Sequence, residues 1–432
     1  MFDKTSFLNL IVGFLSPTVI LLWFLIRIVS LHSTNFYNCL NEQLFATYMK
    51  AYLFFFENVG INKVGFIVSS IPKIFIYGDV DVLEKDQEKV LYMANHLSTC
   101  NCNELFSSMV LADWFLVSIL LSRQGNIGRS RFLLHKNLKY IPVFGFYLSQ
   151  AWCIFVDRSN FQEEKAKNVL RQLRQLKTKP WVVIYPEGRR YNPELKDVIK
   201  ESQEFAKQND LKPYIHVLTP RTRGFRLLID EMHDYLDAVY DTTVIYAEEN
   251  GCPLDSRIRV PQMTSWFGRR HTLHIIVNRI PMSKIPKEPK RVKSWLMERF
   301  GLKDEFLERV QSKFHEPSDP VLMASGQNNT DSHESIGQKS ARQNDDEVDQ
   351  HRNWKSDVPV EQTIVKLLPP QFPRCVIQLK PLSLIQLIPS VIFFFGITFY
   401  WIFGFGWYGP LTFVLISIFG TLAGEIYVHY AV

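Results

Sequence analysis

Residues 90–114 read VLYMANHLSTCNCNELFSSMVLADW, and the rest of the chain is organised around this stretch. The apolar run at 90–94 predicts a short buried strand, which ends at Asn95 and His96. Polar residues follow at once, and residues of this kind cap helices. Because α/β sheets present reactive groups at the carboxyl ends of their strands, His96 is the candidate base for chemistry near neutral pH.

Strand and helix patterns alternate beyond this stretch, which is typical of an α/β fold. Further strands are expected at residues 153–156, 181–185, 216–218, 242–246 and 273–277. Helices are expected at residues 113–121, 163–177, 201–208, 227–236 and 292–314. The predicted fold is an α/β sheet flanked by helices, with transmembrane helices added at both ends of the chain.

Both ends of the chain are strongly apolar. Residues 6–26 carry no charge and are long enough to cross a bilayer core of about 30 Å, as a signal anchor does; a cleaved signal peptide is the alternative. Residues 381–424 also carry no charge and are interrupted only by a glycine-rich break at 404–410. That length suits two spans or a re-entrant hairpin.

These patterns divide the chain into five parts. We expect a membrane anchor at 1–35, a membrane-proximal helical region at 36–84 and the α/β domain at 85–314. Residues 315–357 are rich in Ser, Asn, Gln, Asp and His, which predicts a disordered linker. Residues 358–432 are assigned to the C-terminal membrane hairpin.

Charge and cysteine content limit the function classes. A net charge of +6 over 432 residues, with Lys and Arg interleaved with acids, gives little support to nucleic-acid binding and fits an anionic lipid or substrate better. The six cysteines lack the spacing of a disulfide framework, which indicates the reducing side of a membrane. Cys100 and Cys102 resemble half a zinc site, but no second pair follows, so we expect no metal.

Three predicted strand ends carry polar residues that meet if the strands are neighbours. They are Asn95-His96, Asp157-Arg158 and the run 187–190, Glu-Gly-Arg-Arg. Arg offers a planar fork of donors to phosphate, so the combination of one base and several cations suits a phosphate ester or coenzyme A. Taken singly, each has a plainer interpretation, a solvated Arg or a Pro-Glu-Gly turn.

Taken together, these motifs resemble the glycerophospholipid acyltransferases, and within them the epsilon-like branch of the 1-acyl-sn-glycerol-3-phosphate acyltransferases. The quoted segments are Asn95-His96, residues 155–159 (FVDRS), 185–190 (YPEGRR) and 216–221 (HVLTPR). The resemblance covers nearly the whole chain. It implies that Arg158 and Arg190 bind the acceptor phosphate, that Glu187 and Gly188 shape the pocket, and that Lys136 is a further anion contact.

The first motif departs from the family pattern. The family has Asp five positions after the histidine, and here that position holds Asn101. Removal of residues 100–111 gives Asn-His-Leu-Ser-Thr-Ala-Asp-Trp and restores the spacing. We therefore interpret 100–111 as an insertion, real or a retained in-frame intron, and Asp113 as the family's aspartate. In the third motif, Arg189 stands where the family usually has Thr.

The resemblance implies an acyl-CoA-dependent O-acyltransferase of phospholipid biosynthesis. It would transfer a fatty acyl group from acyl-CoA, as co-substrate and with no cofactor, to lysophosphatidic acid and form phosphatidic acid. His96 would be the base and Asp113 would orient it. Two alternatives stay open: another lysophospholipid acceptor, or a catalytically silent lipid-binding protein if residues 100–111 separate the pair. The expected location is the endoplasmic reticulum membrane, multi-pass, with the outer mitochondrial membrane or nuclear envelope also possible.

Overall fold

A mixed β-sheet forms the centre of the computed structural model, which describes residues 4–58, 60–61, 67–68, 73–97, 112–125, 127–140, 144–157, 161–175, 179–257, 272–315 and 358–431. The strands of the sheet are β3 (Lys73–Gly78), β4 (Val90–Ala94), β5 (Ser130–His135), β6 (Ile154–Val156), β7 (Trp181–Ile184), β8 (Ala238–Ala247), β9 (Thr272–Pro281) and β10 (Val376–Leu379). Within these residues they lie in the order β10-β3-β9-β8-β4-β7-β5-β6. A separate pair, β1 (Gly60–Ile61) and β2 (Ile67–Val68), is antiparallel.

Strand direction decides which loops meet. β4 is parallel to both β7 and β8, and β5 is parallel to both β6 and β7. The carboxyl ends of these five strands therefore share one edge of the sheet. β9 is antiparallel to β8, β3 is parallel to β9, and β10 is antiparallel to β3.

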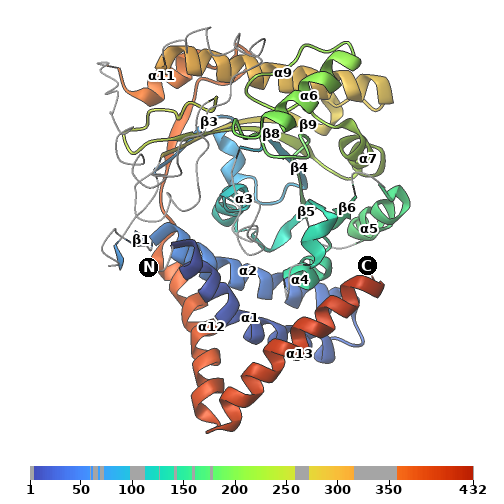
Figure 1. Cartoon of the computed structure of the whole chain (residues 1–432), viewed down its shortest axis with the longest axis vertical. Helices are drawn as coiled ribbons and strands as arrows, with labels where there is room; N and C mark the ends of the chain where they lie inside the picture. Colours follow the sequence, from blue (N-terminus) through green and yellow to red (C-terminus); the bar gives the residue numbers. More distant parts are fainter. Residues whose placement is uncertain are drawn as a thin grey trace, which may run out of the picture.

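Helices lie on both faces of the sheet and, at the chain ends, in an assembly beside it (Figure 1). They are α1 (Lys4–Val29), α2 (Thr34–Asn58), α3 (Ala112–Arg123), α4 (Phe144–Gln150), α5 (Glu163–Gln175), α6 (Lys196–Gln208), α7 (Thr222–Met232), α9 (Pro289–Phe314), α11 (Val360–Leu367), α12 (Leu384–Gly404) and α13 (Tyr408–Ala431). Because side chains alternate along a strand, β4 contributes to two cores. Tyr92 packs with Val117 of α3 in one core, whereas Leu91 and Met93 pack with Phe300 of α9 in the other.

Helix α2 is attached to the sheet domain by polar contacts. Glu42 of α2 forms an ion pair with the buried Arg131 of β5. Asn41 Nδ2 donates to the carbonyl of Gln150 at 3.2 Å. A Cβ on Gly128 would lie 2.5 Å from the Glu42 carbonyl oxygen, so the glycine allows the helix to approach closely. These contacts join the N-terminal helices to the α/β domain.

The chain ends form one helical assembly beside the sheet (Figure 1). Among the described residues, only α12 is long and apolar enough to cross a membrane. The apolar stretches described in α1 and α13, Phe14–Val29 and Tyr408–Phe419, are shorter. The structure therefore offers one candidate span, and the spans expected at 6–26 and after the 404–410 break stay predictions.

The sheet includes segments that the sequence analysis grouped with membrane-associated regions. β3, from the region expected to be helical, lies between β10 and β9. β10 comes from the segment assigned to the C-terminal hairpin, and it pairs with β3 from Val376↔Tyr77 to Leu379↔Ile74. Ile364 of α11 is fully buried in the core that α9 shares. The predicted linker lies outside the described residues except for His315.

Most predicted elements are present within a few residues of their expected bounds, but the strand expected at 216–218 is wrong. Side chains, rather than a neighbouring strand, satisfy the backbone N–H groups there. Asp304 Oδ1 accepts from the N–H groups of Ile215 at 2.9 Å and His216 at 2.7 Å. Ser202 Oγ accepts from Thr219 N at 2.8 Å. Because every non-proline N–H needs a partner when buried, these side chains hold an irregular segment in the interior.

Candidate active site

Asn95 extends the pairing between β4 and β8 by one residue. Its side chain is 1% exposed. Asn95 Nδ2 donates to the Val244 carbonyl at 3.1 Å, and Val244 N donates to Asn95 Oδ1 at 2.8 Å. A buried amide satisfied on both sides holds its backbone firmly. The following residue, His96, is thereby held at the carboxyl edge of the sheet.

The segment 185–191, which follows β7, contacts His96 in three ways. Glu187 Oε1 accepts a hydrogen bond from His96 N at 2.7 Å. Tyr191 N donates to the His96 carbonyl at 2.8 Å. The His96 ring stacks on the ring of Tyr185, with centroids 4.5 Å apart and planes inclined by 22°. Both the backbone and the ring of His96 are therefore positioned by one loop.

Glu187 joins three segments of the chain. It is 3% exposed, and its second carboxylate oxygen accepts from Leu218 N at 2.8 Å. Gly188, with φ of 69°, forms the turn in which its N–H donates to the Tyr185 carbonyl at 2.9 Å. A side chain in that left-handed conformation is strained. Glu187 and Gly188 thus hold the backbone around His96, and their role in shaping the substrate pocket stays a prediction.

Lys136 and Asp157 follow neighbouring strands at the same edge. Lys136 comes directly after β5 and Asp157 directly after β6, and their side chains form an ion pair. The Lys136 side chain is 43% exposed, so the pair lies at the surface of the edge rather than in the core. In the sheet order, β5 separates β6 from β7.

Arg189 and Arg221 both pair with Glu201 beyond β7, and Arg190 follows Arg189 in the chain. Arg189 pairs with Glu201 at 2.7 Å, and Arg221 places its guanidinium 3.8 Å from the centre of the Phe205 ring. Arg190 is half-buried and has no hydrogen bond or ion pair with any other described residue. Burial lowers the pKa of Arg221 from its ordinary value. Three guanidinium groups with one carboxylate leave an excess of positive charge here.

Two predicted site residues, Asp113 and Arg158, lie wholly or partly outside the described residues. Asp113 lies in the first turn of α3, which begins at Ala112, but its side chain lies outside the described part of the chain. Arg158, Cys100 and Cys102 belong to segments that the structure does not describe. The proposed insertion at 100–111 lies outside the described residues as well. The pairing of His96 with Asp113 therefore stays a prediction.

Burial also affects Tyr191 and an ion cluster in the core of the domain. Burial raises the pKa of Tyr191 to about 12. Between β8 and α9, the carboxylate of Asp241 contacts Arg299 Nε at 2.6 Å and also pairs with Lys303. All three members of this cluster are buried, and burial lowers the pKa of Lys303. Each cation thus pairs with the Asp241 carboxylate, as buried charges require.

Sequence reasoning missed Tyr185 as a member of the site. Its only signal in the chain is its position, directly after β7 and before Pro186.

In the described segments, no group of His, Cys, Asp and Glu side chains is arranged to hold a metal ion. What the arrangement offers is the imidazole of His96 at the carboxyl edge, held by a loop that also carries cationic side chains. That combination suits proton transfer next to a bound anion.

Comparisons with known proteins agree with the motifs. Residues 73–244 match the family described as Acyltransferase, and residues 267–319 match the one described as Acyltransferase C-terminus. The chain is 35% identical to the 1-acyl-sn-glycerol-3-phosphate acyltransferase epsilon of Mus musculus, over 71% of this chain and 76% of the mouse protein. It is 30% identical to the probable 1-acyl-sn-glycerol-3-phosphate acyltransferase 5 of Arabidopsis thaliana, over 73% of each chain. It is 27% identical to the lysocardiolipin acyltransferase 1 of Danio rerio, over 48% of this chain and 52% of that protein.

Proposed function

The chain belongs to the 1-acyl-sn-glycerol-3-phosphate acyltransferase family and is an O-acyltransferase, and from this premise we propose that it transfers a fatty acyl group from acyl-CoA to lysophosphatidic acid. The product is phosphatidic acid, and acyl-CoA acts as a co-substrate, with no bound cofactor. One observation carries the proposal. His96 stands at the carboxyl edge of the sheet, held on its backbone by Glu187 and Tyr191, and the loop that holds it also carries Arg189 and Arg190.

His96 acts as general base and then as general acid. Its neutral imidazole removes the proton from the acceptor hydroxyl as that oxygen attacks the thioester carbonyl. The C–S bond then breaks, and the imidazolium returns the proton to the departing coenzyme A thiolate. Asp113, in the first turn of α3, orients the imidazole and stabilises its cation, as carboxylates do in catalytic triads.

The cations bind the acceptor phosphate. Arg190 is the strongest candidate, because it is half-buried and has no ion pair or hydrogen bond with the other described residues. Lys136 and Arg158 are further candidates from the ends of β5 and β6. A phosphate offers several acceptor oxygens to guanidinium and ammonium donors. Placing it here brings the free hydroxyl of the acceptor toward His96.

The membrane supplies both substrates. We propose that α12, with α1 and α13, holds the enzyme in a bilayer, and that this bilayer is the endoplasmic reticulum membrane. The exposed face of α12 is apolar, with Ile385 83% and Phe403 73% exposed. Exposed apolar surface of this extent suits lipid rather than water. The acceptor then reaches the cationic edge from the surface of the same membrane.

The second candidate function differs from the first in the head group of the acceptor lipid. One relative is named for lysocardiolipin, so acylation of another lysophospholipid is the second candidate. The cationic edge suits any acceptor with a phosphate, which means that chemistry alone does not choose between the two.

The test is acyl transfer by the purified full chain in detergent micelles. Radiolabelled acyl-CoA is supplied with lysophosphatidic acid, lysocardiolipin or lysophosphatidylcholine, and lipid products are separated. We expect transfer to lysophosphatidic acid, and a loss of at least about 10²-fold in His96→Ala because general base catalysis has that magnitude. His32→Ala, at an exposed residue between α1 and α2, is the matched control. Full activity in His96→Ala would contradict the proposed role of His96 as the base. Transfer only to lysocardiolipin would contradict lysophosphatidic acid as the acceptor.

A further inference from the structure

The ring of His96 rests on the ring of Tyr185 across the boundary between two strands. The centroid distance of 4.5 Å and the inclination of 22° describe a stacked pair. Parallel pairing places the two strand ends side by side, since Met93 of β4 is opposite Ile184 of β7. Tyr185 is thus the first residue beyond β7 and His96 the second beyond β4.

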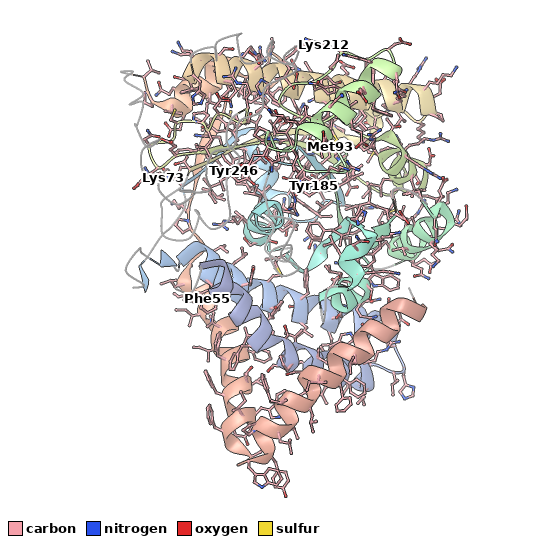
Figure 2. The ribbon with its side chains drawn as sticks, viewed as in Figure 1. Phe55, Lys73, Met93, Tyr185, Lys212 and Tyr246 are labelled. Carbon is pink, nitrogen blue, oxygen red and sulfur yellow. The ribbon has the colours of Figure 1, made fainter. Side chains whose placement is uncertain are left out.

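The position of Tyr185 is set by its backbone surroundings. The Tyr185 carbonyl accepts from Gly188 N at 2.9 Å, and the neighbouring Pro186 carbonyl accepts from Arg221 N at 2.7 Å. Tyr185 is half-buried, and Figure 2 labels it close to Met93 of β4. A ring on such a constrained backbone offers His96 a fixed surface.

Stacking has two physical consequences for a histidine that gains a proton during reaction. The flat contact restricts rotation of the imidazole, so its nitrogen keeps one direction. The face of an aromatic ring also carries negative electrostatic potential and attracts a cation placed over it. The ring of Tyr185 therefore favours the imidazolium that forms when the acceptor hydroxyl loses its proton.

We propose that Tyr185 is a positioning residue for His96, acting through its ring face to orient the imidazole and to stabilise the imidazolium in the acyl transfer step. The inference rests on the proposed function, because it needs His96 as the base. It assigns the effect to the aromatic ring, so a phenylalanine retains it and an aliphatic side chain of similar size does not.

The test compares Tyr185→Phe and Tyr185→Leu in the purified full chain. We expect Tyr185→Phe to keep kcat within about twofold, and Tyr185→Leu to lose about 10-fold, the magnitude of a partly desolvated cation–π contact. We expect the KM for lysophosphatidic acid to stay nearly constant, because the inference assigns Tyr185 to the imidazole and not to the acceptor. The acidic limb of the kcat/KM profile moves to lower pH in Tyr185→Leu by up to about one unit, since the imidazolium is less favoured.

A second variant covers the case in which Tyr185→Leu fails to fold. Tyr185→pentafluorophenylalanine keeps the shape of Tyr185→Phe and reverses the charge distribution of the ring face. A fall in kcat relative to Tyr185→Phe, with an unchanged melting temperature, supports the inference. Tyr235→Leu, on an aromatic residue after α7, is the matched control and keeps full activity.

The outcomes separate this inference from the proposed function. If His96→Ala is inactive while Tyr185→Leu retains the wild-type kcat and pH profile, Tyr185 has no positioning role and the base assignment stands. Equal kcat values for Tyr185→Phe and the pentafluorinated variant would show that the ring acts only through its shape. They would overturn the proposed electrostatic stabilisation of the imidazolium. Wild-type activity in His96→Ala would contradict the assignment of His96 as the base, and with it the proposed function of the site.

Discussion

The hydroxyls of Thr18 and Thr398 lie 2.6 Å apart, although 380 positions separate them in the chain. Both residues are completely buried, one in α1 and the other in α12. Thr398 Oγ1 already donates to the Phe394 carbonyl at 2.7 Å. Since a hydroxyl has one proton, Thr18 is the donor of the shared bond. The first and the penultimate helices are therefore joined by a directed polar contact inside an apolar assembly.

Removing this hydrogen bond should lower the free energy of unfolding, because it weakens the contact between α1 and α12. We expect Thr18→Val and Thr398→Val each to lower stability, and the double variant to lose less than the sum of the two. Interhelical hydrogen bonds in apolar surroundings give coupling energies of about 0.6 to 1.7 kcal/mol. SDS titration of the purified protein measures the coupling, and strictly additive losses would show that the hydroxyls do not interact.

Arg190→Ala should weaken acceptor binding more than it slows turnover. Loss of a charge-assisted hydrogen bond of about 1.5–3 kcal/mol corresponds to a rise of about 10- to 100-fold in the KM for lysophosphatidic acid. The matched control is Arg189→Ala, since Arg189 pairs with Glu201 at the surface. Steady-state kinetics over a range of acceptor concentrations provides the comparison. A KM unchanged in Arg190→Ala contradicts the phosphate assignment.

Glu187→Gln should reduce both stability and kcat. Each carboxylate oxygen accepts from one backbone N–H, of His96 and of Leu218. An amide nitrogen would turn a donor toward one of those donors, and leaving a buried N–H unpaired costs about 1–3 kcal/mol. Thermal unfolding and acyl transfer are measured together, with the exposed Glu201→Gln as the control. Wild-type values of both in Glu187→Gln would deny Glu187 its bridging role.

Asp241→Asn should destabilise the α/β domain severely. The substitution keeps the shape of the side chain but leaves the charges of Arg299 and Lys303 buried without their carboxylate. Breaking a buried ion pair by neutralising one partner costs about 3–5 kcal/mol. Asp234→Asn breaks the exposed pair with Arg174 and should move the melting temperature little. Similar melting temperatures for the two variants would contradict the prediction.

His274 should make the domain sensitive to mild acid. Its ring is completely buried, with Nδ1 2.7 Å from the Tyr77 hydroxyl and Nε2 2.8 Å from the Gly251 carbonyl. Burial lowers the pKa of His274 from 6.5 to about 4. The unfolded chain therefore takes up the proton first as the pH falls. The stability that neutral His274 contributes is complete above pH 6.5 and is lost between 6.5 and about 4, to a total of about 3 kcal/mol.

The variant His274→Gln keeps polar atoms near both partners and removes the titrating group. Thermal unfolding of wild type and variant is compared at pH 7.5 and pH 5. Because other groups also titrate in this range, the informative quantity is the difference between the two proteins. A pH dependence in His274→Gln as steep as in the wild type would assign the effect to other residues.

Local sequence pattern determined the α/β class and most of its elements. The run 90–94 is apolar and β-branched or aromatic enough to form β4, and the polar residues after it identify His96. Ala166, Leu170 and Leu173 are buried on one face of α5, in agreement with helical periodicity. The motifs also identified the family, because their order along the chain carries the resemblance.

Only the tertiary structure decided which side chains surround His96. Glu187 reaches its backbone from 91 positions away, and the ring contact with Tyr185 depends on β4 and β7 being neighbours in the sheet. Periodicity reports which face of a strand is buried but not which strand lies beside it. The strand expected at 216–218 shows the same limit, since carboxylates distant in sequence took the place of a partner strand.

Contacts between the two ends of the chain were likewise not predictable from local sequence patterns. Apolar composition marked residues 6–26 and 381–424 as membrane segments without relating one to the other. The Thr18–Thr398 bond and the pairing of β10 with β3 depend on how distant segments pack together. Packing between distant segments is a property of the folded chain as a whole, because each contact needs both partners in place. The sequence thus determined the elements and the candidate base, His96, and the fold determined what holds that residue in position.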